Sequence, residues 1–193
     1  RHPDRPTCLA VAPDGSRVAS GGTDGTVRVW NPTTGTEVHR VTVPDQTAIA
    51  VAYSPDGSVL GAHFGDQQVR LFDARTFRLV RVVKTDNLDS FTLSREGKVL
   101  AGVGSTGNLC LLDTATGLPL LELPQGKGVA VSADGARAAA AHGAGVGAWG
   151  VPGRKATADE WESPDPVAAG MADVVLSPDG SRLAAADVAP GVR

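Results

Sequence analysis

The sequence predicts an all-β protein, an incomplete ring built as a β-propeller arc of four-stranded antiparallel blades. Two observations predict this fold. First, a tight corner that ends in glycine recurs roughly every 40 residues, at Gly15, Gly57, Gly97, Gly135 and Gly180. Second, each interval holds short apolar runs separated by turn residues, and no helical period extends over a useful length. One such unit cannot bury its faces alone, so consecutive units are expected to stack side by side.

The repeats divide the chain of 193 residues into four complete blades and the start of a fifth, within a single domain. The blades are expected at approximately residues 7–43, 48–83, 89–123, 128–161 and 174–193, the last one truncated. The expected strands are Cys8–Ala12, Arg17–Gly21, Thr26–Asn31 and Glu37–Val43, then Ala48–Ser54, Val59–Phe64, Gln68–Ala74 and Arg78–Val83, then Asp89–Ser94, Val99–Val103, Asn108–Thr114 and Pro119–Leu123, then Gly128–Ser132, Arg137–His142, Val146–Val151 and a weak Ala156–Trp161, and finally Val174–Ser177 and Arg182–Ala186.

The position of a strand within its blade is visible in its composition. Leu9–Ala12 is continuously apolar, which predicts a strand packed on both sides near the propeller axis. Arg78–Arg81 mixes charged and apolar residues, which predicts a solvated outer edge whose charges oppose strand-to-strand aggregation.

The corner turns have a physical reason. Pro13–Gly15, Pro55–Gly57 and Pro178–Gly180 read Pro-Asp-Gly, and Arg95–Gly97 and Ala133–Gly135 are variants. Proline presets φ, aspartate bonds the local backbone, and glycine adopts a positive φ, so two antiparallel strands meet in a short turn.

Composition and charge exclude several classes of partner. A net charge of −3 gives no general attraction to nucleic acid or to an anionic membrane, and no run approaches the ~18 apolar residues of a membrane span. Cys8 and Cys110 fall in strands of different blades and are predicted to be reduced core thiols, which favours a cytoplasmic location. A composition rich in Ala, Gly and Arg and poor in Lys is associated with a bacterial source.

The third strand of the first unit carries a resemblance to a known family. Asp24–Asn31 reads Asp-Gly-Thr-Val-Arg-Val-Trp-Asn, which resembles the third-strand signature of WD40 repeats with Asn31 in place of the usual Asp. Val69–Asp73, Leu109–Asp113 and Val146–Gly150 are progressively more degenerate copies. The resemblance covers nearly the whole chain and implies a β-propeller. Asp113–Gly117 is also similar to the YVTN-type propeller repeats of bacterial surface proteins.

WD40 repeats often tie their turns with a hydrogen-bonded set of His, Ser or Thr, Asp and Trp. The resemblance assigns this set to His2, Ser20, Asp24 and Trp30. The second unit keeps only Asp66 of the set, so we expect a tied turn in blade one alone and packing to hold the other blades. Because WD40 rings most often have seven blades, we expect a segment of a larger ring. Its open strand edges allow self-association.

No motif in the chain predicts chemistry. Gly102–Gly107 matches G-x-G-x-x-G, but a strand follows where a dinucleotide site needs a helix. The histidines His2, His39, His63 and His142 lack ligand spacing and are expected to face solvent or bond to turns, so we expect no metal and no cofactor. No nucleophile elbow is present, and we expect no catalytic residue. The basic run from Arg70 to Lys84 is interpreted as a solvated edge, and Trp161 either packs against blade five or forms a contact hot spot.

The leading function is therefore a non-enzymatic scaffold that binds a protein or peptide partner through the loops on one propeller face. Loop positions on that face are the candidate contacts: Arg5, Asp45, Gln46, Asp66, Gln67, Asp86, Asn87, Ser105 and His142. Two alternatives remain open. One is a segment of an enzymatic or redox propeller of the quinoprotein or lactonase type, and the other is a sensor domain attached to a bacterial signalling enzyme.

Overall fold

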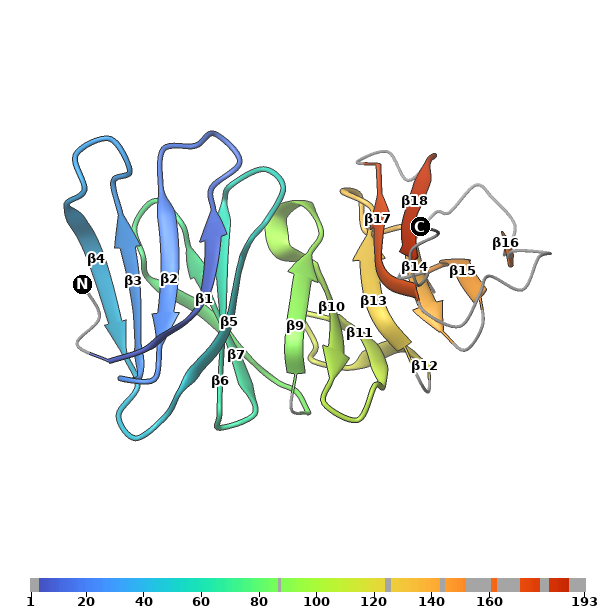
Figure 1. Ribbon diagram of the computed structural model, residues 1–193, viewed down its shortest axis with the longest axis horizontal. Helices are drawn as coiled ribbons and strands as arrows, with labels where there is room; N and C mark the ends of the chain where they lie inside the picture. The colour runs from blue at the N-terminus through green and yellow to red at the C-terminus, as the bar shows by residue number, and fades with distance from the viewer. Residues whose placement is uncertain are drawn as a thin grey trace, which may run out of the picture.

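The computed structural model describes residues 4–86, 88–123, 126–142, 145–151, 161–162, 171–177 and 181–187. It is an arc of antiparallel sheets that stand side by side, and the chain passes from one sheet to the next without crossing over (Figure 1). In the described residues the sole helical element is the 3-10 turn η1 (Arg95–Gly97). The prediction of an incomplete, nearly all-β propeller is confirmed.

Each complete sheet has four strands that follow one another in chain order. Blade one contains β1 (Pro6–Val11), β2 (Val18–Gly22), β3 (Thr26–Trp30) and β4 (Glu37–Thr42); blade two contains β5 (Ala48–Tyr53), β6 (Val59–Phe64), β7 (Gln68–Asp73) and β8 (Leu79–Lys84); blade three contains β9 (Leu88–Leu93), β10 (Val99–Gly104), β11 (Leu109–Asp113) and β12 (Pro119–Leu123). Blade four contains β13 (Gly126–Val131), β14 (Arg137–His142), β15 (Gly145–Gly150) and β16 (Trp161–Glu162), and β17 (Met171–Leu176) pairs with β18 (Leu183–Asp187) in the fifth sheet.

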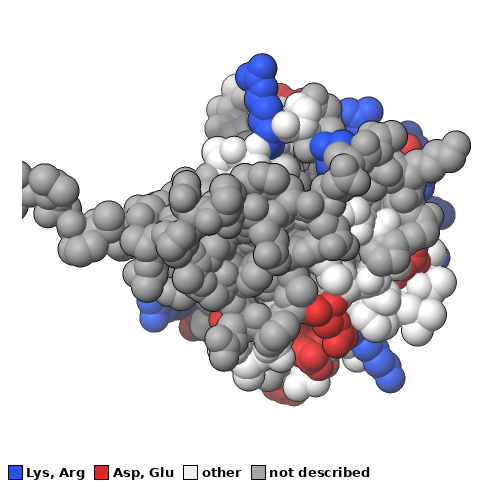
Figure 2. All heavy atoms as spheres, turned by 90° about the vertical axis from the view of Figure 1, so that its right-hand side faces the viewer, with Lys and Arg blue, Asp and Glu red and all other residues white. Residues whose placement is uncertain are grey.

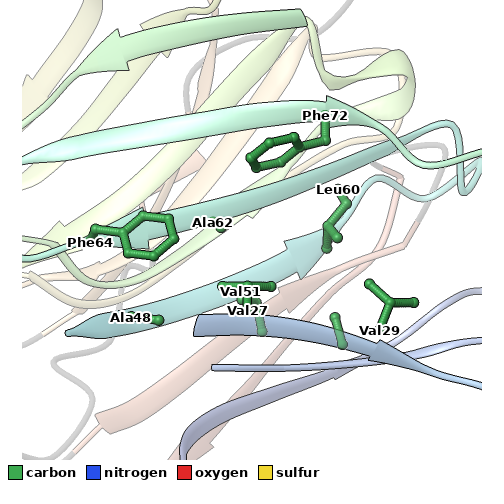
Figure 3. Packing of buried hydrophobic residues seen from close by; sticks show 9 residues of the cluster. Val27, Val29, Ala48, Val51, Leu60, Ala62, Phe64 and Phe72 are labelled. Carbon is green, nitrogen blue, oxygen red and sulfur yellow. The ribbon is translucent and has the colours of Figure 1, made fainter. Parts of the chain in front are cut away.

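The hydrophobic core lies between blades. Figure 3 shows Leu60, Ala62 and Phe64 of β6 facing Val27 and Val29 of β3. All five are at most 1% exposed, because the period of two along a strand sends alternate side chains to the neighbouring blade. The same alternation aims Gly61 in the opposite direction, where a Cβ would lie 2.8 Å from the Phe91 ring of blade three.

The innermost strands of blades one and two differ in burial. In β5, Ala48, Ala50 and Val51 are all buried, because neighbouring blades cover this strand on both sides. In β1, by contrast, Leu9 is 67% and Val11 is 55% exposed. Both side chains share the face of blade one that no described blade covers, so the apolar run was wrongly interpreted as packing on both faces here.

The corner glycines have the predicted conformation, and the structure adds a second reason for them. Gly15, Gly57, Gly97 and Gly135 have φ between 63° and 71°, and Gly180 lies outside the described residues. A Cβ at Gly135 would lie 3.0 Å from Val99 of the preceding blade. The corners at Gly57, Gly97 and Gly135 therefore also contact the preceding blade, whereas a Cβ at Gly15 would meet nothing within 4 Å.

Two regularities were absent from the sequence-based expectations. A register shift recurs where the innermost strand meets the second, in every sheet from blade one to the fifth. In addition, a buried serine precedes three corners, and its Oγ accepts a hydrogen bond from the backbone five residues later: Ser54, Ser94 and Ser132. The recurring Ser before the second and later corners was the available signal, since Ala12 takes this place before the first corner. The register shift, a β-bulge, has no comparable signal in the sequence, because it depends on how two strands pair.

Candidate functional site

The tied turn of blade one is partly visible. Trp30 Nε1 donates to Ser20 Oγ at 2.8 Å, as the WD40 resemblance implies. Asp24 accepts from Thr26 Oγ1 at 2.7 Å and pairs with the Arg28 guanidinium at 3.1 Å. His2 lies outside the described residues. The turn after β2 is thus held by a strand-three arginine that the sequence-based prediction did not include.

Blade two repeats this pairing of a turn aspartate with a strand-three arginine, which we call the arginine clamp. Arg70 donates to both carboxylate oxygens of Asp66, at 3.1 and 2.6 Å, and its guanidinium lies 5.0 Å from the centre of the Phe64 ring. The clamp lowers the pKa of Asp66 below its ordinary value. The expectation that packing alone holds blade two is therefore wrong. Sequence comparison of Asp24–Arg28 with Asp66–Arg70 could have found it, since both pairs have the same spacing.

The candidate contact loops lie on one rim of the arc, the lower rim in Figure 1, where the β6–β7 and β10–β11 turns lie. Three of them meet at a cleft of about 600 Å³ between blades two and three: Gln67, Asp86 and Ser105. Arg5, Asp45 and Gln46 lie on blade one and on the β4–β5 connection, and they do not line this cleft. Asn87 and the side chain of His142 lie outside the described residues.

The cleft combines an apolar floor with an acidic wall. Leu88 and Leu109, each 1% exposed, contribute to the floor together with Cys110. Asp86 and Glu122 contribute carboxylates, and Ser105, Thr106 and Asn108 contribute hydroxyl and amide groups from the β10–β11 turn. Figure 2 shows acidic side chains grouped toward this same lower rim. A cationic side chain with an aliphatic stem matches both surfaces.

The pKa of the Cys110 thiol reports the electrostatics of the cleft. Burial, followed by the negative charges of Asp86 and Glu122, raises the pKa of Cys110 to about 11. The thiol is therefore protonated at neutral pH and is a poor nucleophile. Burial also raises the pKa of Cys8, and both cysteines are free. The cleft thus suits binding rather than thiol chemistry.

His63 of β6 corrects the expectation that the histidines face solvent or bond to turns. Its side chain is fully buried, and within the described residues neither ring nitrogen makes a hydrogen bond of acceptable geometry. Burial is the largest influence and lowers the pKa of His63, while the Leu88 backbone and the charges of Asp66 and Asp89 have smaller effects that raise it. Among the described side chains no three His, Cys, Asp or Glu groups converge as metal ligands would.

His63 makes stability depend on pH. The unfolded chain binds a proton near pH 6.5 and the folded chain only at lower pH, so stability should fall as the pH drops below about 6.5. The expected slope approaches about 1.4 kcal/mol per pH unit. Urea unfolding at pH 7, 6 and 5 measures it, and His63→Met should flatten the profile. Parallel profiles for the two proteins would contradict the assignment.

Comparison with known proteins identifies the repeats. The family model described as "WD domain, G-beta repeat" matches residues 1–31. The periodic tryptophan protein 2 homolog of Dictyostelium discoideum is 33% identical over 98 residues, which are 48% of this chain and 11% of that protein. Ribosome biogenesis protein ERB1 of Phaeosphaeria nodorum is 45% identical over 65 residues, which are 32% of this chain and 8% of that protein.

A human relative and a solved structure agree with these matches. The angio-associated migratory cell protein of Homo sapiens is 34% identical over 95 residues, which are 48% of this chain and 22% of that protein. The chain thus spans less than a quarter of each of these three relatives. The solved structure of U3-55K superposes with a TM-score of 0.66 at 16% identity, covering 84% of this chain and 52% of that one. These relatives come from eukaryotes, so the predicted bacterial source is not supported.

Proposed function

Because the chain is built of consecutive WD40-type β-propeller blades, we propose that it is a non-catalytic scaffold that binds a protein or peptide partner through its loop rim. One observation carries this proposal: the cleft between blades two and three brings Gln67, Asp86 and Ser105 together from three separate loops. Rigid β-strands hold loops of independent sequence at this rim, which is the arrangement that recognition surfaces commonly use.

The chemistry of the cleft defines the kind of partner. The carboxylates of Asp86 and Glu122, together with the apolar part of the cleft lining, favour a segment that inserts a lysine or arginine with its aliphatic stem. Backbone and amide groups of the partner can bond to Ser105, Thr106 and Asn108 at the cleft wall. Complementary charge also predicts that binding weakens as salt is added.

Location and neighbours complete the proposal. Two free cysteines on different blades are compatible with a reducing compartment, and we place the protein in the cytoplasm on that ground. Within the described part of the chain, no helix has the length and apolar character needed to cross a bilayer. The relative named for ribosome biogenesis supports a role in assembling other macromolecules, and the chain would contribute a docking surface to such an assembly.

A peptide-display selection on the immobilised protein tests the proposal. Selected peptides should be enriched in lysine or arginine, and the double variant Asp86→Lys/Glu122→Lys should weaken them about tenfold or more. Glu96→Lys is the matched control, because Glu96 is exposed in η1 on the opposite rim. Peptides that bind the unaltered protein, the double variant and the Glu96→Lys control equally would refute the cleft as the binding site. A selection that enriches no peptide would refute it as well.

A further inference from the structure

The outermost strand of blade two, β8, has a surface that the loop-rim function does not use. Leu79, Val80 and Val82 are 53%, 62% and 43% exposed, although three large aliphatic side chains in one six-residue strand would ordinarily be covered. In the part of the chain that the structure describes, no strand pairs with the outer edge of β8, so its outward backbone groups are available.

The charge around this edge is of one sign. Between Asp73 and Asp86 the sequence contains four basic residues and no acidic one: Arg75, Arg78, Arg81 and Lys84. Arg78 and Lys84 are exposed and make no ion pair with any described residue. The equivalent strand of blade one differs, because the Arg40 guanidinium there is neutralised by Glu37 at 2.8 Å.

A groove runs along β8 on its blade-three side. It encloses about 250 Å³ between Arg81–Lys84 and the β11–β12 turn at Thr114–Gly117. Arg81 spans it by donating from Nη1 to the Ala115 carbonyl. An extended segment laid beside β8 could therefore place alternate side chains into the groove and over the exposed aliphatic face.

We propose that β8 is a β-augmentation site that accepts an extended acidic–aliphatic segment of a partner protein as a fifth strand of blade two. Backbone pairing with β8 supplies register. The partner's aliphatic residues cover Val80 and Val82, which share one face of the strand, and its carboxylates meet Arg78 and Lys84 at the two ends of β8. This surface is separate from the cleft and does not depend on it.

A second copy of the chain is a poorer occupant than an acidic segment. Antiparallel pairing of two β8 strands centred on Arg81 sets Arg81 opposite itself and Arg78 opposite Lys84. Like charges directly opposite one another destabilise a strand pair. The same basic residues that oppose self-pairing attract a segment of opposite charge.

The test uses a fluorescein-labelled peptide that alternates valine and glutamate, with a valine–lysine peptide of equal length as its charge-reversed control. Anisotropy should show saturable binding of the acidic peptide and at least tenfold weaker binding of the basic one. Val80→Asp and the double variant Arg78→Glu/Lys84→Glu should each weaken the acidic peptide about tenfold. Val38→Asp, on the equivalent outer strand β4, should leave it unchanged.

Hydrogen exchange locates the contact. The bound acidic peptide should protect backbone amides of β8 and not those of β4. Equal binding of both peptides, no binding, protection elsewhere, or a dimer that Val80→Asp dissociates would each overturn the proposal. Asp86→Lys/Glu122→Lys should leave this binding intact, so failure of the cleft and failure of β8 remain distinguishable.

Discussion

Phe64→Ala should cost about 3–5 kcal/mol of the free energy of unfolding, a large share of the roughly 5–15 kcal/mol typical of a folded domain. Phe64 is fully buried between blades one and two, where it belongs to the cluster that includes Val27, Val29 and Leu60 (Figure 3). Truncation removes its transfer free energy and leaves a cavity at the boundary between blades. It also removes the ring beneath the Arg70 guanidinium.

Urea unfolding of the unaltered protein and of Phe64→Ala measures this loss of stability. Leu79→Ala is the matched control, since Leu79 is a large aliphatic residue of the same blade that is 53% exposed, and it should change stability by no more than about 0.5 kcal/mol. A loss below about 1 kcal/mol for Phe64→Ala would contradict the inter-blade core, because a buried phenylalanine cannot be truncated so cheaply.

Gly25→Ala should destabilise the protein by about 3 kcal/mol or more, because it combines backbone strain with a collision. Gly25 has a φ of 71°, and a Cβ there would lie 2.4 Å from the Val43 carbonyl oxygen and 2.8 Å from that of Gln46. Both oxygens belong to the connection from blade one to blade two, which also bonds to this turn through Val43 N–H and the Gly25 carbonyl at 2.9 Å. Backbone cannot move aside as a flexible side chain can.

The controls for Gly25 separate strain from collision. Gly15 and Gly35 have φ of 70° and 69°, but a Cβ at either meets nothing within 4 Å. Alanine there should cost only the left-handed strain of about 1–2 kcal/mol. Thermal or urea unfolding of the three variants gives the comparison. Equal losses at all three positions would show that the turn after β2 does not contact the next connection.

The architecture could be predicted because it depends on local and periodic features. Corner glycines at Gly15 and Gly57 report a positive φ that few other residues adopt, and a repeated corner indicates a repeated unit. Ser20 and Trp30 could be assigned from the family pattern, and the structure joins them at 2.8 Å. The arginine clamp at Asp66 was not predicted, although its spacing is present in the sequence, because the family's hydrogen-bonded set includes no arginine.

The site was harder to predict, because it depends on which loops become neighbours. Gln67, Asp86 and Ser105 were candidates by topology alone, and nothing in the sequence distinguished them from Arg5 or Asp45. The burial of His63 was likewise hidden, because it depends on blade three covering the face of β6 that His63 shares with Gly61.

Periodicity along the chain was enough to establish the blades, their strand order and their turns, because those features arise from backbone preferences of residues close in sequence. The tertiary structure decided the rest: stacked blades form the cleft around Cys110 and bury His63, while Leu9 and the aliphatic edge of β8 have no neighbour to cover them. Each of these results depends on the distance between atoms of different blades, and a repeat pattern in the sequence does not give that distance.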